Sequence, residues 1–354
     1  MKPTSNLKPD IRRATPDELR TFLLDRGEKP FRVKQIWAWL WQRSARSFGE
    51  MSNLSKALRE TLSEHWDLRP ALVEKEQRSA DGTVKSIFRL HDGHRVEGVL
   101  IPAADRMTAC VSSQVGCSLS CKFCATGYMP RKRNLDAGEI YDQVVAIRDQ
   151  AERYFGQPLT NVVYMGMGEP LLNYAGVMQS IEHLTAREGL HMSAQRITLS
   201  TAGIAKMIRK LGDDKVRFNL ALSLHAADDA KRNQIMPINE SNTLVALRDA
   251  LQHFYRQTRT RVTFEYIVFY DFNDTLEDAA ALYRFTKQVP SKVNIIEYNP
   301  IQEADFVNTD EDRLDAFRDY LEARGVIVNV RRSRGKDIDA ACGQLALKEE
   351  AAGA

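Results

Sequence analysis

The chain has 354 residues, 43% of them hydrophobic and 27% charged, so it can bury a large core, and we expect a catalytic domain with a smaller appendage. Five cysteines are an odd number, which disfavours a disulfide-stapled secreted protein. The N-terminus carries charged residues such as Lys2, Lys8 and Arg12 and no apolar run, so we expect neither a secretory signal nor a membrane span, and therefore a cytoplasmic location.

Three helices are predicted within residues 1–68. Thr15-Pro16-Asp17-Glu18 combines an N-cap hydroxyl, a proline at the first helical position and a Glu at the third, which is a capping box. Leu54, Leu58 and Leu62 mark a later helix. The middle helix has one apolar stripe at i, i+3, i+4, i+7 and i+8, formed by Val33, Ile36, Trp37, Leu40 and Trp41.

The charge of this helical segment is positive. The net charge of the chain is only +3, yet residues 1–50 hold eleven Lys and Arg against six Asp and Glu. Such a surplus suits contacts to phosphates, although ordinary solvated helix faces produce it about as often. We expect residues 1–68 to form a small basic helical domain.

An antiparallel β extension is predicted over residues 69–106. Its strand patterns run over 72–79, 84–90 and 95–102. Asp81-Gly82 and Asp92-Gly93 separate them, and both pairs favour tight hairpin turns.

Cys117, Cys121 and Cys124 form a Cys-x3-Cys-x2-Cys run. Three thiolates can hold three irons of a 4Fe-4S cluster, which leaves the fourth iron open to bind a small molecule and pass it an electron. A structural zinc site is the alternative, but it needs four ligands, and Asp136 and the distant His183 are poor substitutes for a fourth cysteine.

From residue 107 to 335, short β-rich runs alternate with helical stretches. The strands are expected near 108–113, 161–167, 196–201, 216–224, 262–269 and 292–298, with an additional run at 326–332. About six β/α units are too few for a closed eight-fold barrel, so we predict an α/β fold with a partial (β/α)6 barrel. Polar residues and glycines follow the strand ends, where barrels carry their active sites.

Four segments give the chain a resemblance to a known family. They are 31–36, 110–117, 165–170 and 337–345, which read FRVKQI, CVSSQVGC, MGMGEP and DIDAACGQL. In these segments the chain resembles the radical S-adenosylmethionine (SAM) ribosomal RNA adenine carbon-2 methyltransferases (RlmN), with the carbon-8 enzymes (Cfr) as relatives. The resemblance implies a radical-SAM barrel over 107–335 and a C-terminal segment, 336–354, that carries a methyl-accepting cysteine.

The resemblance also implies one 4Fe-4S cluster on the three motif cysteines and a SAM site. The SAM site would consist of Gly168, Glu169, Ser200, Ser223, Leu224, His225 and Asn299. Glycine lets a backbone approach a ligand closely, and Glu169 can accept hydrogen bonds from an ammonium group. Without the cluster motif, Gly-x-Gly would be read as a turn and His225 as a buried core histidine.

Two further cysteines would carry the distinctive chemistry, because carbon 2 of adenine is too electron-poor to attack a methyl cation donor. By resemblance, Cys342 takes a methyl from one SAM, a second SAM supplies a radical, Glu97 removes the ring proton, and Cys110 forms a disulfide with Cys342. On the residues alone, Cys110 also fits a small buried hydrophobe, and Glu97 fits the solvent face of a strand.

The substrates implied by the resemblance are 23S rRNA, in the peptidyl transferase centre, and tRNA, at the adenosine 3' of the anticodon. Candidate phosphate contacts besides the N-terminal helices are Arg131, Lys132, Arg133, Arg331, Arg332, Arg334 and Lys336. We expect a monomer that takes electrons from a flavodoxin or ferredoxin-type reductant. The alternatives are a carbon-8 methyltransferase and a non-catalytic, zinc-stabilised RNA-binding protein.

Overall fold

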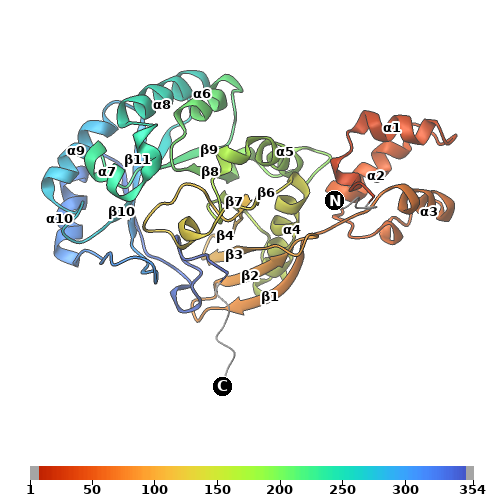
Figure 1. The fold of residues 1–354 in the computed structure, drawn as a ribbon, viewed down its shortest axis with the longest axis horizontal. Coiled ribbons are helices and arrows are strands. Elements are labelled where there is room, and N and C mark those ends of the chain that lie inside the picture. Colours follow the sequence, from red (N-terminus) through yellow and green to blue (C-terminus); the bar gives the residue numbers. More distant parts are fainter. Residues whose placement is uncertain (1–7, 348–354) are drawn as a thin grey trace, which may run out of the picture.

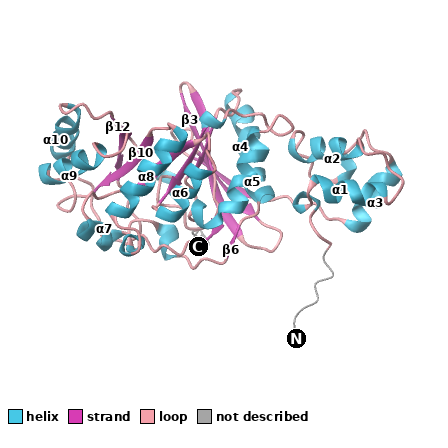
Figure 2. Cartoon of the chain, turned by 90° about the horizontal axis from the view of Figure 1, so that it is seen from above, coloured by secondary structure: helices cyan, strands magenta, loops and turns pink. Residues whose placement is uncertain are grey.

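The computed structural model describes residues 8–347, in which a small helical lobe stands beside a large, helix-covered sheet (Figure 1). Residues 1–7 and 348–354, the ends of the first and last predicted segments, lie outside the described residues. The lobe contains α1 (Pro16–Leu24), α2 (Arg32–Trp41) and α3 (Lys56–His65). It projects from one end of the molecule, whereas α9 and α10 lie at the other (Figure 2).

Local sequence determines how the lobe helices begin and which face they bury. The capping box is confirmed, since Thr15 Oγ1 accepts from the Glu18 amide at 3.2 Å and Glu18 Oε2 accepts from the Thr15 amide at 2.7 Å. Along α2, the predicted stripe is buried except at Trp37, which is only partly buried. The Trp37 ring lies edge-on to His183, 5.8 Å away, at the junction with the rest of the protein.

A buried ion-pair network and an aromatic stack hold the lobe against α4 (Ala137–Phe155) and α5 (Tyr174–Thr185). Arg12 is 6% exposed and reaches Asp142 of α4 at 2.7 Å and Asp10 at 3.1 Å. The ring of Trp41 stacks on His183 of α5, with 3.6 Å between centroids. Because the charge of Arg12 is paired with a carboxylate of α4 and the ring of Trp41 stacks on a ring of α5, the junction is specific.

The predicted antiparallel meander is confirmed. It consists of β1 (Leu72–Arg78), β2 (Val84–Arg89) and β3 (Arg95–Ala103), and β3 continues antiparallel into β4 (Arg106–Cys110). Gly82 and Gly93, in the two hairpin turns, have φ of 88° and 83°, which side chains with a Cβ rarely adopt. The boundary expected at residue 106 thus falls within one continuous sheet. The division of the chain into segments 1–68, 69–106, 107–335 and 336–354 stays a prediction.

Seven parallel strands follow the meander in the same ten-stranded sheet. Their order is β4, β7 (Asn161–Tyr164), β8 (Ile197–Thr201), β9 (Asn219–Ser223), β10 (Val262–Val268), β11 (Ser291–Glu297) and β12 (Val328–Arg331). The sheet has β1 at one edge and β12 at the other, so the barrel stays open. The partial barrel is therefore confirmed, and the additional run at 326–332 is its last strand.

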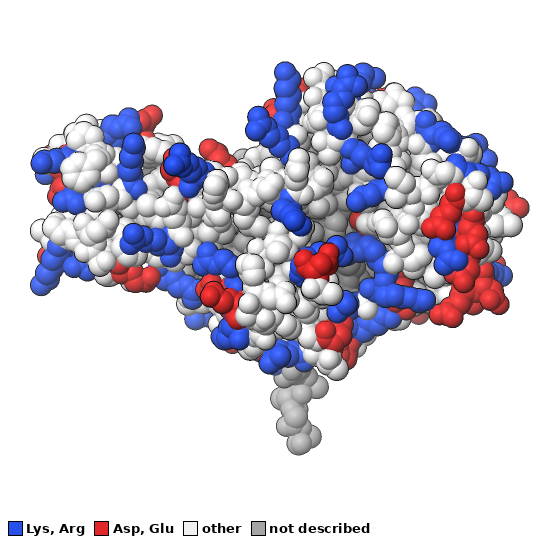
Figure 3. Space-filling model, turned by 180° about the vertical axis from the view of Figure 1, so that it is seen from behind, with Lys and Arg blue, Asp and Glu red and all other residues white. Residues whose placement is uncertain are grey.

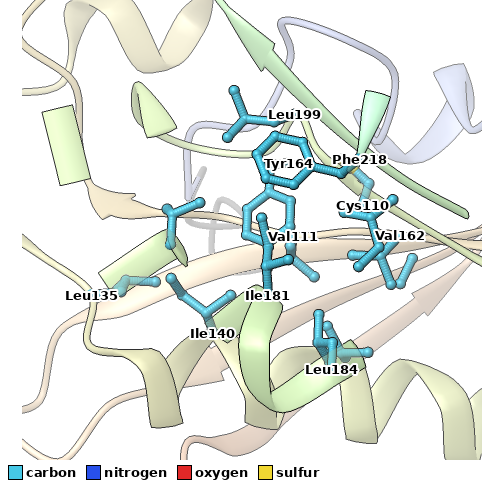
Figure 4. Packing of buried hydrophobic residues seen from close by; sticks show 14 of the residues in the cluster. Cys110, Val111, Leu135, Ile140, Val162, Tyr164, Ile181, Leu184, Leu199 and Phe218 are labelled. Atoms are coloured by element: carbon cyan, nitrogen blue, oxygen red, sulfur yellow. The ribbon is translucent and has the colours of Figure 1, made fainter. Parts of the chain in front are cut away.

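Helices connect and cover the parallel strands. Besides α4 and α5 they are α6 (Ala205–Asp213), α7 (Asp229–Ile235), α8 (Leu244–Thr258), α9 (Leu276–Thr286) and α10 (Glu311–Glu322). Figure 4 shows Val111, Val162 and Leu199 of the sheet side packed with Ile140 and Ile181 of the covering helices. None of the helices within residues 8–347 combines the length and apolar character needed to cross a bilayer.

Candidate active site

The three motif cysteines lie in a loop, residues 117–124, that is closed at its base by β5 (Gln114–Val115) and β6 (Arg133–Asn134), a strand pair that sequence reasoning missed. The loop is held from two sides. The Lys122 amide donates to the Ile235 carbonyl of α7 at 3.0 Å, and just beyond the loop the Ala125 amide donates to the Gly343 carbonyl at 2.7 Å. The C-terminal segment is therefore fastened directly to this cysteine loop.

One cavity brings most of the predicted site together. Its lining includes all three cysteines of the loop and six other predicted residues, namely Gly168, Glu169, Ser200, Ser223, His225 and Cys342. These residues come from the carboxyl ends of successive strands and from the C-terminal segment. Parallel strands place those ends at one rim, so distant parts of the sequence meet there.

Glu169 is a buried carboxylate whose oxygens point at backbone amides. Its Oε2 accepts from the Ala202 amide at 2.8 Å and its Oε1 from the Leu171 amide at 3.0 Å. Burial nevertheless raises the pKa of Glu169, and these hydrogen bonds oppose that rise. A ligand ammonium group in the cavity would stabilise the ionised form.

The glycine before Glu169 is required by packing. Gly168 has φ of 94°, and a Cβ there would lie 2.5 Å from Cβ of Gln114, next to the cysteine loop. The Glu169 amide donates to Gln114 Oε1 at 2.9 Å. We expected this glycine to admit a ligand, but its immediate effect is to let the strand-end loop approach the base of the cysteine loop.

The next two strands contribute hydroxyl groups and one imidazole. Ser200 Oγ and Ser223 Oγ face each other at 3.5 Å. His225 Nδ1 accepts from the Ile267 amide at 3.0 Å, and its ring packs edge-on against Phe123 of the cysteine loop, 4.6 Å between centroids. Burial lowers the pKa of His225 to about 3, so this histidine is neutral at physiological pH and orients the loop as a packed ring.

Two predicted SAM residues are close to the cavity without lining it. The Leu224 side chain is fully buried in the core, and its backbone carbonyl accepts from Arg232 Nε at 3.1 Å. Asn299 Nδ2 donates to the Cys342 carbonyl at 3.1 Å, while Asn299 Oδ1 is buried and has no partner in the described residues. An unpaired buried oxygen so near the cavity is a position for a ligand donor.

The chemistry of the cysteine loop fits an iron–sulfur cluster. Burial raises the pKa of Cys117 to about 11 and also raises the pKa of Cys121 and Cys124. A cationic metal group would stabilise these thiolates. Among residues 8–347, no three His, Cys, Asp or Glu side chains converge to hold a single metal ion, whereas a cluster binds each thiolate to a different iron.

The two weak candidates for a fourth zinc ligand are engaged elsewhere. Asp136 caps the N-terminus of α4 by accepting from the Glu139 amide at 2.9 Å, and it pairs with Arg13. His183 is in the stack with Trp41 at the lobe junction. Neither lines the cavity with the cysteines.

Cys342 lines a second cavity as well as this one. Both cavities are lined by Cys342 and Arg331, and the second also by Cys110, Arg106, Arg332 and Arg334. Cys342 is exposed. Its sulfur-bearing side chain therefore borders the cysteine-loop cavity on one side and an arginine-rich cavity on the other.

Cys110 lies at the end of β4 and is buried in the core, as the alternative reading expected, yet it also lines the second cavity. Burial raises its pKa to about 12, and the neighbouring Cys342 contributes to the rise. Cys110 and Cys342 line the same cavity.

Glu97, by contrast, lines neither cavity. It is 1% exposed, so the solvent-facing alternative is wrong. Its Oε1 pairs with Lys85 at 3.5 Å, and its Oε2 accepts from the Ala346 amide at 2.9 Å.

Sequence reasoning missed an ion pair in the wall of the first cavity. Arg331 Nη1 lies 3.4 Å from Glu265 Oε2, and Asn294 donates to Glu265 at 2.9 Å. Glu265 is the only charged residue of β10, all of which is buried. A charged residue within a buried strand indicates either a functional group or an ion pair, and this signal could have been found in the sequence. Two of the predicted phosphate contacts form ion pairs within the protein. Arg133 pairs with Glu139 and Asp92, and Lys336 pairs with Glu297 at 2.7 Å.

Comparison with known proteins assigns the family. Residues 10–68 match the N-terminal domain of ribosomal RNA large subunit methyltransferases, and residues 111–285 match the radical SAM superfamily. A probable dual-specificity RNA methyltransferase RlmN of Cytophaga hutchinsonii is 62% identical over 97% of this chain and 94% of its own length. The dual-specificity RNA methyltransferase RlmN of Geobacter sulfurreducens is 44% identical over 97% of this chain and 95% of its own.

A solved structure agrees with this assignment. The radical SAM methyltransferase from Sphaerobacter thermophilus superposes with a TM-score of 0.89 at 40% identity, covering 95% of this chain and 99% of its own. Radical SAM enzymes of this family work with a 4Fe-4S cluster and SAM, which the thiol-lined cavity suits. The chain belongs to the RlmN family of radical SAM dual-specificity RNA methyltransferases.

Proposed function

We propose that the enzyme methylates carbon 2 of an adenosine in the peptidyl transferase centre of 23S rRNA and of the adenosine 3' of the tRNA anticodon. One observation carries the chemical part of this proposal, namely that Cys342 lies between the cysteine-loop cavity and the arginine-rich cavity. A thiolate in that position can accept a methyl group from one side and present it to an RNA base on the other.

The cluster, when bound to Cys117, Cys121 and Cys124, supplies the single electron that splits SAM reductively. Within the proposal, Glu169, Ser200, Ser223 and His225 form the walls of the SAM site, with Asn299 and the backbone at Leu224 just behind them. The unpaired Asn299 Oδ1 and the amide-bound Glu169 carboxylate offer acceptors for a ligand ammonium or hydroxyl.

Cys342 has two successive bonds to make. Its Sγ would first attack the methyl carbon of one SAM and displace S-adenosylhomocysteine. The deoxyadenosyl radical from a second SAM would then take a hydrogen atom from that methyl, and the carbon radical left on Cys342 would add to adenine carbon 2. Once the ring proton is removed and the cluster has taken back the unpaired electron, Cys110 Sγ would attack Cys342 Sγ and the bond from that sulfur to the methylene would break. The methylene would keep that electron pair and take up a proton to become the methyl group of the product. The shared lining of both cysteines in the second cavity supports this step.

Glu97 is proposed as the base that removes the ring proton. The structure sets a condition for that role, because Glu97 is held by Lys85 and by the Ala346 amide away from both cavities. The C-terminal segment around Ala346 would have to shift for the carboxylate to reach an adenine beside Cys342.

The second cavity suits an unstacked nucleotide. Arg106, Arg332 and Arg334 line it together with the shared Arg331, and a base beside Cys342 would bring its phosphates among these guanidinium groups. Acidic side chains gather at the end of the molecule that carries α9 and α10, whereas Lys and Arg are spread over the middle and the lobe (Figure 3). Exposed Arg131 and Lys132 extend this basic surface past the cysteine loop.

We further propose a monomer in the cytoplasm that receives electrons from a flavodoxin or ferredoxin-type protein. The family membership makes the non-catalytic, zinc-stabilised alternative wrong. Reaction of the anaerobically reconstituted enzyme with SAM carrying a deuterated methyl, with 23S rRNA and tRNA as substrates, tests the regiochemistry. Digested nucleosides should co-elute with 2-methyladenosine in mass spectrometry, and co-elution with 8-methyladenosine would instead establish the carbon-8 alternative.

A further inference from the structure

Arg232 of α7 is fully buried, and the mechanism above does not use it. Its guanidinium donates to four neutral acceptors, which are the carbonyls of Ala202 (2.6 Å), Ser223 (3.2 Å) and Leu224 (3.1 Å) and Oδ1 of Asn239 (2.6 Å). No carboxylate in the described residues forms an ion pair with it. Asp229, a nearby acid, is separated from it by Asn239, which donates to Asp229 at 2.8 Å.

A second buried arginine shows what is unusual here. Arg12 is 6% exposed, and its guanidinium contacts the carboxylates of Asp10 and Asp142 at 3.1 and 2.7 Å. A buried charge without an opposite charge is strongly unfavourable unless something else compensates it. Arg232 therefore needs a source of negative charge other than a directly paired side chain.

The surroundings of Arg232 identify that source. Ala202 and Ser223, whose carbonyls it binds, line the cavity of the cysteine loop, as does Met236 just beyond α7. One turn after Arg232, the Ile235 carbonyl of α7 accepts from the Lys122 amide inside the loop at 3.0 Å. Arg232 thus lies directly behind the wall that joins the strand ends to the cysteines.

Its electrostatics point the same way. Burial lowers the pKa of Arg232 to about 10, and Cys121 is the first of the groups that oppose this fall. At neutral pH the guanidinium remains protonated, so a permanent positive charge lies behind the wall of the cavity that the three thiols line.

We infer that Arg232 is a positioning residue that provides the buried counter-charge of the iron–sulfur cluster and makes the cluster easier to reduce. Each added electron makes a thiolate-bound cluster more negative, and a fixed cation nearby stabilises the reduced form. Through its three hydrogen bonds to main-chain carbonyls the same side chain holds the ends of β8 and β9 at the SAM site. The inference rests on the cluster of the family and is independent of which adenine carbon is methylated.

The test is a redox titration with dithionite under anaerobic conditions, followed by the electron paramagnetic resonance signal of the reduced cluster. Arg232→Gln should shift the midpoint potential to more negative values, with the reduction equilibrium weakened at least about tenfold, which is about 59 mV for one electron. Arg232→Lys keeps the charge and should restore most of the potential. Arg12→Gln, the matched control, removes a buried arginine far from the cluster and should leave the potential unchanged.

Iron analysis separates the possible failures. An Arg232→Gln protein with four irons per chain and an unchanged potential overturns the inference and leaves the proposed function intact. If Arg232→Gln fails to fold, Asn239→Asp places a negative charge on the Arg232 guanidinium and should also shift the potential to more negative values; an unchanged potential there overturns the inference. Wild-type protein that holds no iron would contradict the proposed function instead.

Discussion

The two cavities that meet at Cys342 differ in what lines them. The first is lined by thiols, small polar side chains and buried carboxylates from strand ends, and arginine enters it only through Arg331. The second contains four arginines and one further thiol, Cys110. Under the proposed function this difference separates two tasks, because the strand ends would enclose the cofactor whereas basic side chains outside them would contact the polyanion. Cys342, the proposed nucleophile, lines both cavities.

Removal of the Cys342 thiol, which both cavities share, is the substitution with the largest expected effect. Cys342→Ala should lower methyl transfer to RNA at least about a thousandfold, because no other thiol lines both sides. Transfer of labelled methyl from SAM to RNA measures the loss. Iron content and the signal of the reduced cluster should match wild type, and substantial methylation by the variant would contradict the proposed route.

Cys110→Ala affects only the arginine-rich cavity. Radical addition from methylated Cys342 does not require Cys110, but release does, so the variant should accumulate enzyme covalently linked to RNA. Denaturing gels with labelled RNA and mass spectrometry of the Cys342 peptide detect the adduct. Free methylated RNA formed at the normal rate would remove Cys110 from the mechanism.

A substitution with a smaller expected effect tests RNA binding in the arginine-rich cavity alone. Arg334→Gln should weaken RNA binding roughly tenfold and reduce the slope of log Kd against log salt concentration by about 1, since one phosphate contact is lost. SAM binding should not change. Arg318→Gln is the matched control because Arg318 of α10 pairs with Asp315 and Asp319 on the acidic end, and an equal effect of both variants would refute a specific contact.

The smallest expected effect concerns stability and should involve neither cavity. Burial lowers the pKa of His183 to about 4, below its unfolded value near 6.5, so the unfolded chain binds more protons in that interval and stability falls as pH decreases. The loss contributed by His183 should steepen below pH 6.5 and approach about 1.4 kcal/mol per pH unit near pH 5, where the unfolded imidazole is protonated and the folded one is not. His183→Phe keeps a ring against Trp41 and should flatten the dependence.

Urea unfolding of wild type and His183→Phe at pH 7.0 and 5.5 measures this difference. His225 also has its pKa lowered by burial and acts in the same direction in both proteins. An identical loss of stability in wild type and variant would show that folding does not lower the pKa of His183.

Local patterns were sufficient for much of the fold. The capping box at Thr15, the two Asp-Gly hairpin turns and the alternation of strands and helices act over a few residues, and each appears where the sequence predicted it. The strand pair β5 and β6 was missed because two-residue strands have no periodicity to detect. Trp37 is only partly buried, unlike the rest of its apolar stripe, because its ring lies at the junction and contacts His183 of α5 edge-on.

Motif spacing and family resemblance placed the three motif cysteines, Cys342 and the residues at strand ends in one candidate site, because strand order along the chain dictates which ends share a rim. Position relative to a cavity wall depends on contacts between segments far apart in sequence. Three features were decided only by the packing of those segments. They are the hydrogen bond from the Ala346 amide to the Glu97 carboxylate, the position of Cys342 in the lining of both cavities, and the place of the Arg232 charge behind the cysteine loop.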